Sequence, residues 1–150
     1  VLVWTGGITG RTAIERSDVK QDNRSHRIPA GRDFRTAEDG IFALGDAALV
    51  DQPGDEPAPP TAQAAWQAAE VAGANIARAI RDKPLREWTF INKGTVVSVG
   101  ESAVAHDVSL VPFVDTFGGR PAQLLKKAIA ARWIKDVAGY DRALRAWPKM

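Results

Sequence analysis

The chain has 150 residues, 45% of them hydrophobic, and a formal net charge of +2 at pH 7. This is the size of one ordinary domain with enough apolar material for a buried core, so a disordered chain is not expected. There is no cysteine and there are two distant histidines, His26 and His106, which argues against disulfide scaffolds, cysteine redox pairs and metal sites.

The first part of the chain is predicted to form short strands joined by loops. Residues 1–5 read as a buried strand running into a Gly-rich loop, and residues 12–21 as a short helix. An apolar strand is expected at 41–44, where a Gly-Asp pair stops it. Residues 51–60 contain four prolines and must form a loop. Because the chain opens inside a strand without methionine, we expect it to be a piece of a longer protein.

The clearest helix is predicted from Thr61 to about Arg81, with Pro84 closing it. Thr61 is the expected N-cap, because its hydroxyl can accept a hydrogen bond from a backbone N–H that the helix leaves unpaired. After this helix the pattern becomes strand-like. Three segments, 95–99, 103–105 and 108–111, are expected to pair as a small antiparallel meander.

Residues 121–147 are predicted to form one or two helices, with Gly139 as the break. From 120 to 150 the chain carries eight basic and two acidic residues, so the remainder is net acidic. Apolar and aromatic residues alternate with these cations at near-helical spacing, which is typical of a helix lying in a membrane interface. A helix packed on its own domain with a solvated basic face is the equally weighted alternative. No nucleic-acid motif accompanies the charge.

Two segments have a pattern that can carry chemistry. In Ile41–Ala48, the pair Gly45-Asp46 would place a carboxylate at the carboxyl end of a strand, where open α/β folds bind ligands. An ordinary turn is the alternative reading of that pair. In Pro59–Gln67, a proline-rich loop leads into a helix start, whose partial positive charge and N–H groups suit an anionic group such as a reduced flavin ring.

Gln63 and Gln67 are four residues apart on one face of this helix, so both could offer amide groups to a polar ring. A packing helix rich in alanine, with two solvated glutamines, is the alternative interpretation of the same pattern.

Taken in order, Val3–Gly7, Ile41–Ala48 and Pro59–Gln67 resemble the closing part of flavoproteins with two dinucleotide-binding folds. Residues 93–104 extend the resemblance to the C-terminal part of type II NADH:quinone oxidoreductases, which are similar to FAD-dependent pyridine nucleotide-disulfide oxidoreductases. The similarity covers nearly the whole chain.

This resemblance implies that Asp46 binds the ribityl hydroxyls of FAD and that the start of the helix lies beside the flavin ring. It also implies that Gln63 and Gln67 face the quinone. The residues assigned to the cofactor in this way are Gly45, Asp46, Thr61, Ala62 and Gln63.

The implied fold is α/β. Residues 1–84 would close a Rossmann-like FAD-binding domain, and 85–150 would form a small α+β element for dimerisation or membrane docking. The implied enzyme passes electrons from NADH through FAD to a quinone, is cytoplasmic and peripheral on the inner face of the cell membrane through 120–150, and is compatible with a homodimer. Both Gly-rich fingerprints for FAD and NADH are absent from these residues, so the piece alone is expected to be inactive.

Two alternatives stay open at this point. Another flavoprotein reductase could use the same scaffold, such as a sulfide:quinone or ferredoxin-type reductase, although the sulfide enzyme needs cysteines that this sequence lacks. The second alternative is a non-catalytic dimerisation or membrane-docking domain.

Overall fold

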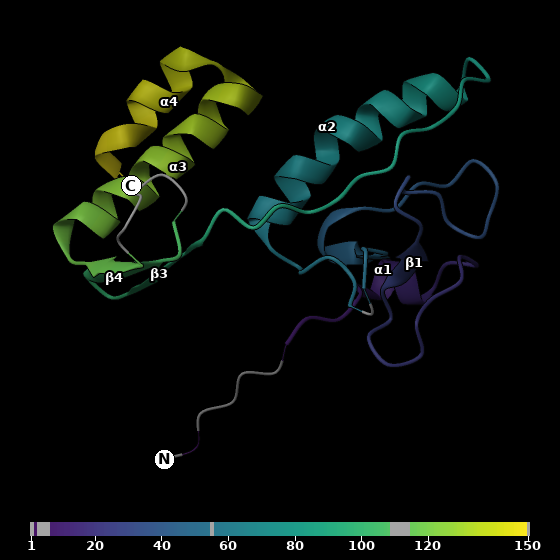
Figure 1. The fold of residues 1–150 in the computed structure, drawn as a ribbon, viewed down its shortest axis with the longest axis horizontal. Coiled ribbons are helices and arrows are strands. Elements are labelled where there is room, and N and C mark those ends of the chain that lie inside the picture. Colours follow the sequence, from purple (N-terminus) through teal and green to yellow (C-terminus); the bar gives the residue numbers. More distant parts are fainter. Residues whose placement is uncertain (1, 3–6, 55, 109–114, 150) are drawn as a thin grey trace. The chain divides into compact units, whose positions relative to one another are not determined.

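The computed structural model describes residues 2, 7–54, 56–108 and 115–149 (Figure 1). The chain divides into two compact units, 1–92 and 93–150, which are described separately. This boundary falls eight residues after the predicted one at 84/85, because residues 85–92 are hydrogen-bonded to the first unit. The strand predicted at 1–5 lies, apart from Leu2, outside the described residues.

The first unit contains a helix α1 (Thr12–Glu15), strands β1 (Ile28–Ala30) and β2 (Ala48–Val50), a 3-10 turn η1 (Gly45–Ala47) and a long helix α2 (Ala62–Ala79). β1 and β2 pair in parallel, with Ile28 opposite Ala48. The α/β class is therefore confirmed, but a Rossmann-like sheet stays a prediction, since the described residues of this unit form only a two-stranded sheet.

The strand predicted at 41–44 is wrong. Residues 41–43 instead turn back on 34–36, where Ala43 N donates to Phe34 O at 3.0 Å and Thr36 N to Ile41 O at 3.1 Å. One isolated bridge results, and the strand forms after the Gly-Asp pair, at β2. The helix predicted at 12–21 is shorter than expected, because α1 ends at Glu15.

α2 forms as predicted, with the Thr61 hydroxyl accepting a hydrogen bond from Ala64 N at 3.2 Å. The residues that α2 buries share one face and are small: Ala64, Ala68, Ala72 and Asn75. The small side chains let the helix backbone lie close to η1, and they share one core cluster with Ala30 of β1 and with Ala48 and Val50 of β2. Phe34 and Trp88 complete this core, with ring centroids 5.5 Å apart.

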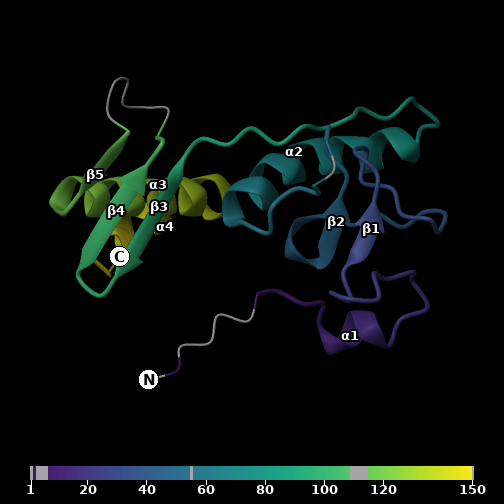
Figure 2. The same cartoon turned by 60° about the horizontal axis from the view of Figure 1, so that its bottom comes forward.

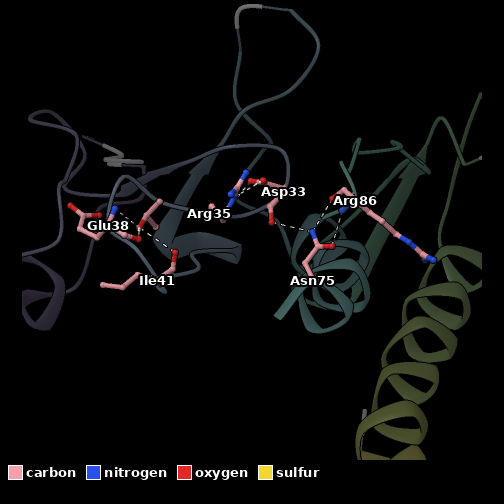
Figure 3. A network of polar contacts seen from close by, with 7 residues as sticks. Asp33, Arg35, Glu38, Ile41, Asn75 and Arg86 are labelled. Atoms are coloured by element: carbon pink, nitrogen blue, oxygen red, sulfur yellow. Dashed lines mark hydrogen bonds and ion pairs between the residues drawn. The ribbon is translucent and has the colours of Figure 1, made fainter. Parts of the chain in front are cut away.

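The chain leaving α2 returns beside the helix and is held by polar contacts (Figure 3). Asn75 is fully buried, and its Nδ2 donates to Asp33 O at 3.1 Å and Arg86 O at 2.8 Å. Its Oδ1 accepts from Arg86 N at 2.9 Å. Further along the return segment, Phe90 N donates to Gln52 Oε1 at 2.6 Å. Residues 85–92 therefore belong to the first unit.

The second unit contains strands β3 (Thr95–Val99), β4 (Ser102–His106) and β5 (Thr116–Gly118), then helices α3 (Arg120–Ala138) and α4 (Tyr140–Ala146) and a final turn η2 (Trp147–Lys149). The strands form an antiparallel sheet in the order β3-β4-β5. The predicted meander is confirmed for its first two strands. The third described strand is β5, while most of the predicted strand 108–111 lies outside the described residues.

One face of this sheet is covered by α3 (Figure 2). Ala103 and Ala105 of β4 are buried with Ala122 of α3. The predicted break is confirmed at Gly139, where φ of +87° ends α3 and the chain starts α4. Among the helices of the described ranges, none combines the length and the hydropathy that a membrane crossing requires.

Candidate functional site

The Gly45–Ala47 turn lies against α2. Gly45 has a φ of +67°, a conformation that residues with a Cβ rarely adopt, and a Cβ added there would lie 3.6 Å from the Cβ of Ala65. The cavity left between the turn, β2 and α2 is about 10 Å³. A space of that size holds no more than about one water, so a ligand at this site would lie over the turn and helix rather than between them.

Asp46 is exposed at the surface of this turn, while the backbone beneath it is held by Arg27. Arg27 Nε donates to Asp46 O at 2.9 Å, and Arg27 Nη2 donates to Ala48 O. Burial lowers the pKa of the Arg27 guanidinium, and the negative charges of Asp46 and Asp22 oppose that shift. The turn thus presents a carboxylate outward above a buried cation.

The start of α2 is accessible, with Thr61 and Ala62 exposed and Gln63 half-buried. The N–H groups in the first turn of an α-helix have no carbonyl partners within the helix, and the helix dipole makes this end partly positive. The Thr61 hydroxyl already accepts from Ala64 N, so its part in this arrangement is to cap the helix.

Both the nitrogen and the oxygen of the Gln67 carboxamide are hydrogen-bonded to the chain that returns along α2. Its Nε2 donates to Ile91 O at 2.9 Å, and its Oε1 accepts from Ile91 N at 3.1 Å. Gln67 Nε2 also lies 3.4 Å from Gln63 Oε1, a weak hydrogen bond between the two glutamines. The shared face predicted for Gln63 and Gln67 is therefore present, and it extends to the backbone of Ile91.

The structure brings the predicted site residues together in two groups. Gly45 packs directly beside Ala65, on the second turn of α2, and Gln63 contacts Gln67. Asp46 and Ala62 are both exposed.

The sequence reasoning missed Arg27 and Ile91. An arginine directly before a buried strand was the one available signal for Arg27, and the exposed Ile91 gave none.

Comparison with known proteins gives two kinds of result. None of the protein-family models matches the chain. Among curated proteins, the type II NADH:quinone oxidoreductase of Haemophilus influenzae is 31% identical over 151 residues, which cover 100% of this chain and 33% of that protein. The enzyme of the same name from Staphylococcus aureus is 31% identical over 147 residues, 95% of this chain and 35% of that protein.

The chain therefore spans about a third of the length of the curated relatives it matches. The family resemblance predicted from the Gly-Asp segment and the alanine-rich helix start is confirmed by this independent similarity. Along its whole length, the chain is homologous to the C-terminal region of type II NADH:quinone oxidoreductases.

Proposed function

We propose that the protein containing this chain is an FAD-dependent NADH dehydrogenase that passes electrons from NADH through the flavin to a quinone. The observation that carries this proposal is the close packing of the Gly45–Ala47 turn on α2, with Asp46 and the start of the helix both exposed. The names of the homologous proteins supply the reaction, and this packing supplies a surface on which such a cofactor could lie.

The residues on this surface fit a flavin cofactor. Asp46 offers carboxylate oxygens, which accept hydrogen bonds from sugar-type hydroxyls, and Gly45 leaves the turn without a side chain on its helix side. The positive end of α2, at Ala62 and Gln63, favours negative charge on a neighbouring ring. When bound, FAD would supply the hydride-accepting and electron-transferring chemistry, while these residues bind it and set its electrostatics.

Gln63 and Gln67 would line the acceptor site on the same helix. Because Gln67 holds both backbone groups of Ile91, it also fixes an apolar side chain that is 63% exposed beside the glutamines. Because the Gln67 carboxamide is engaged with Ile91, its proposed part is to position this isoleucine, whose apolar side chain suits the apolar part of a quinone.

The test of the acceptor site is Gln67→Leu in the intact protein. Rapid-mixing absorbance would follow flavin reduction by NADH and flavin reoxidation by quinone as separate steps. We expect reoxidation to slow by about tenfold or more, since the variant loses both hydrogen bonds to Ile91 and so releases it, while reduction by NADH changes little. The exposed Glu70→Gln on the same helix is the control. Equal slowing of both steps would remove Gln67 from the acceptor site.

The test of the cofactor site is Asp46→Ala. This variant should lower the flavin content of the purified intact protein, because the ribityl hydroxyls lose their acceptor. Flavin absorbance per protein measures the effect, and an unchanged ratio would contradict the assignment of Asp46.

A second role, membrane docking, is supported by the surface of α3 and α4. Tyr140 and Leu144 are 71% and 70% exposed, and Trp133 and Val137 are also largely exposed. Cationic side chains share these helices, an arrangement that suits an anionic membrane surface. We propose that 120–150 holds the protein on the inner, cytoplasmic face of the cell membrane, with a homodimer through the same surface as the alternative occupant.

Charge reversal tests docking without removing α3, whose Ala122 is part of the core of the second unit. Arg142→Glu with Arg145→Glu should reduce binding of the intact protein to vesicles containing anionic lipid, since each cation near such a surface contributes about 1 kcal/mol. Arg11→Glu, exposed in the first unit, is the control. Unchanged flotation together with a lower mass in solution would favour the homodimer.

A further inference from the structure

Arg27 is a charged residue in the buried interior of the first unit. Only 6% of its surface is exposed. Arginine is rarely buried to this extent unless its charge and its hydrogen-bond donors are paired. It stands directly before β1, and its side chain reaches two carbonyls of one short stretch, those of Asp46 and Ala48. A rigid fork with two donors on two nearby acceptors fixes orientation as well as distance.

One of these carbonyls lies within the Gly45–Ala47 turn and the other at the first residue of β2. The β1–β2 ladder begins at the pair Ile28 and Ala48, so the Gly45–Ala47 turn lies just before the first rung. Gly45 has a positive φ, and glycine leaves the backbone free to adopt many other conformations. Arg27 continues the connection one residue beyond the ladder, so it restrains the turn from the side of β1 while α2 packs against it.

The turn that Arg27 restrains carries the exposed carboxylate of Asp46. The charge of Asp46 acts favourably on the Arg27 guanidinium, as does that of Asp22. Because Arg27 bonds the main-chain carbonyl of Asp46 itself, its guanidinium acts directly on the residue that bears this carboxylate.

We infer that Arg27 is a positioning residue for the cofactor site: its buried guanidinium clamps the Asp46 and Ala48 carbonyls and so sets where the Asp46 carboxylate points. This inference rests on the proposed function, in which Asp46 binds the ribityl hydroxyls of FAD. Arg27 itself, buried beneath the turn, would not touch the cofactor.

The experiment is a double-mutant cycle on flavin affinity, using the intact protein stripped of flavin and titrated with FAD by fluorescence. Arg27→Gln should weaken binding by about tenfold or more, the size expected for losing a charge-assisted hydrogen bond. In the Asp46→Ala background the same change should have little further effect, because Arg27 acts through Asp46. Arg35→Gln, at an exposed arginine paired with Asp33, is the control and should leave affinity unchanged.

The outcomes separate the two proposals. Additive losses from Arg27→Gln and Asp46→Ala would assign Arg27 a purely structural role and overturn the inference alone. No loss from Asp46→Ala would overturn the flavin assignment of Asp46, and the inference with it. If Arg27→Gln fails to fold, Arg27→Lys replaces it in the cycle, since lysine keeps the charge but cannot form the fork. An affinity fully restored by lysine would show that charge alone suffices and would refute the clamp.

Discussion

Asn75 offers the sharpest test of how the first unit is held together. Its side chain is fully buried and makes three hydrogen bonds to the backbone, to the carbonyls of Asp33 and Arg86 and from the amide of Arg86 (Figure 3). Asn75→Leu keeps a side chain of similar size but removes all three partners at once. The substitution therefore removes the polar link between α2 and the returning chain without opening a large cavity.

The magnitude follows from the groups left without partners. A buried donor or acceptor that loses its hydrogen bond costs about 1–3 kcal/mol. Arg86 is itself exposed, so water can reach its backbone groups and the cost there is at the low end. We expect a loss of about 3 kcal/mol in total. Asn75→Asp should be worse at neutral pH, because a buried carboxylate would face two carbonyl oxygens.

Hydrogen exchange measures this loss where it occurs. Because about 1.4 kcal/mol corresponds to a factor of ten, the amide of Arg86 should exchange roughly a hundredfold faster in Asn75→Leu than in the unchanged protein. Asn23→Leu, at an exposed turn, is the matched control and should leave exchange at 85–92 unchanged. Equal protection of the Arg86 amide in Asn75→Leu and the unchanged protein would refute the reasoning.

Two further predictions concern the backbone and pH. Gly45→Ala should destabilise the intact protein by about 1–2 kcal/mol in denaturant unfolding. The cost comes from the φ of +67°, since the contact that the new Cβ would make with Ala65 is an ordinary one. Gly73→Ala, in open space within α2, should instead stabilise the protein by about 0.5–1 kcal/mol. The Ser25 hydroxyl and amide lower the pKa of Asp22, so the stability they add is present above the ordinary carboxyl pKa and lost as pH falls through the lowered one. Ser25→Ala should raise that pKa in an NMR titration, and no shift would contradict the assignment.

α2 and the break between α3 and α4 could be predicted because their signals are local. Thr61 supplies a cap, the alanines that follow favour helix, and Pro84 prevents continuation, so α2 is determined by residues within a few positions of it. Gly139 likewise interrupts the C-terminal helix through its own conformation. Each of these features depends on neighbours in sequence and not on the rest of the fold.

The strand at 41–44 could not be predicted correctly because its partner decides its structure. An apolar run of four residues fits a strand wherever it pairs, and residues 41–43 pair with 34–36 instead of joining β1. The place beside β1 is taken by Ala48–Val50, which follows the Gly-Asp pair. Hydrophobic periodicity is a property of one segment and does not specify the segment with which it will pair.

The polar contacts that hold the site could not be predicted from the sequence, for a related reason. Arg27 reaches carbonyls 19 and 21 residues away, Asn75 a carbonyl 42 residues away, and Gln67 the backbone 24 residues away. Each binds backbone, which every residue has, so no complementary side chain marks the partner. The candidate residues Asp46, Gln63 and Gln67 were found from the family pattern, whereas their supports were found only from the structure.

The alanine-rich character of α2 explains why these supports are polar. The small residues on the buried face of α2 bury little apolar area each, so each contributes little stabilisation. Asn75 near the end of α2 and Gln67 near its start compensate by tying the returning chain along the helix. Trp88 anchors the same segment in the hydrophobic core against Phe34. The position of the proposed acceptor site therefore depends on the side-chain-to-backbone hydrogen bonds of Gln67 and Asn75 as well as on this core contact.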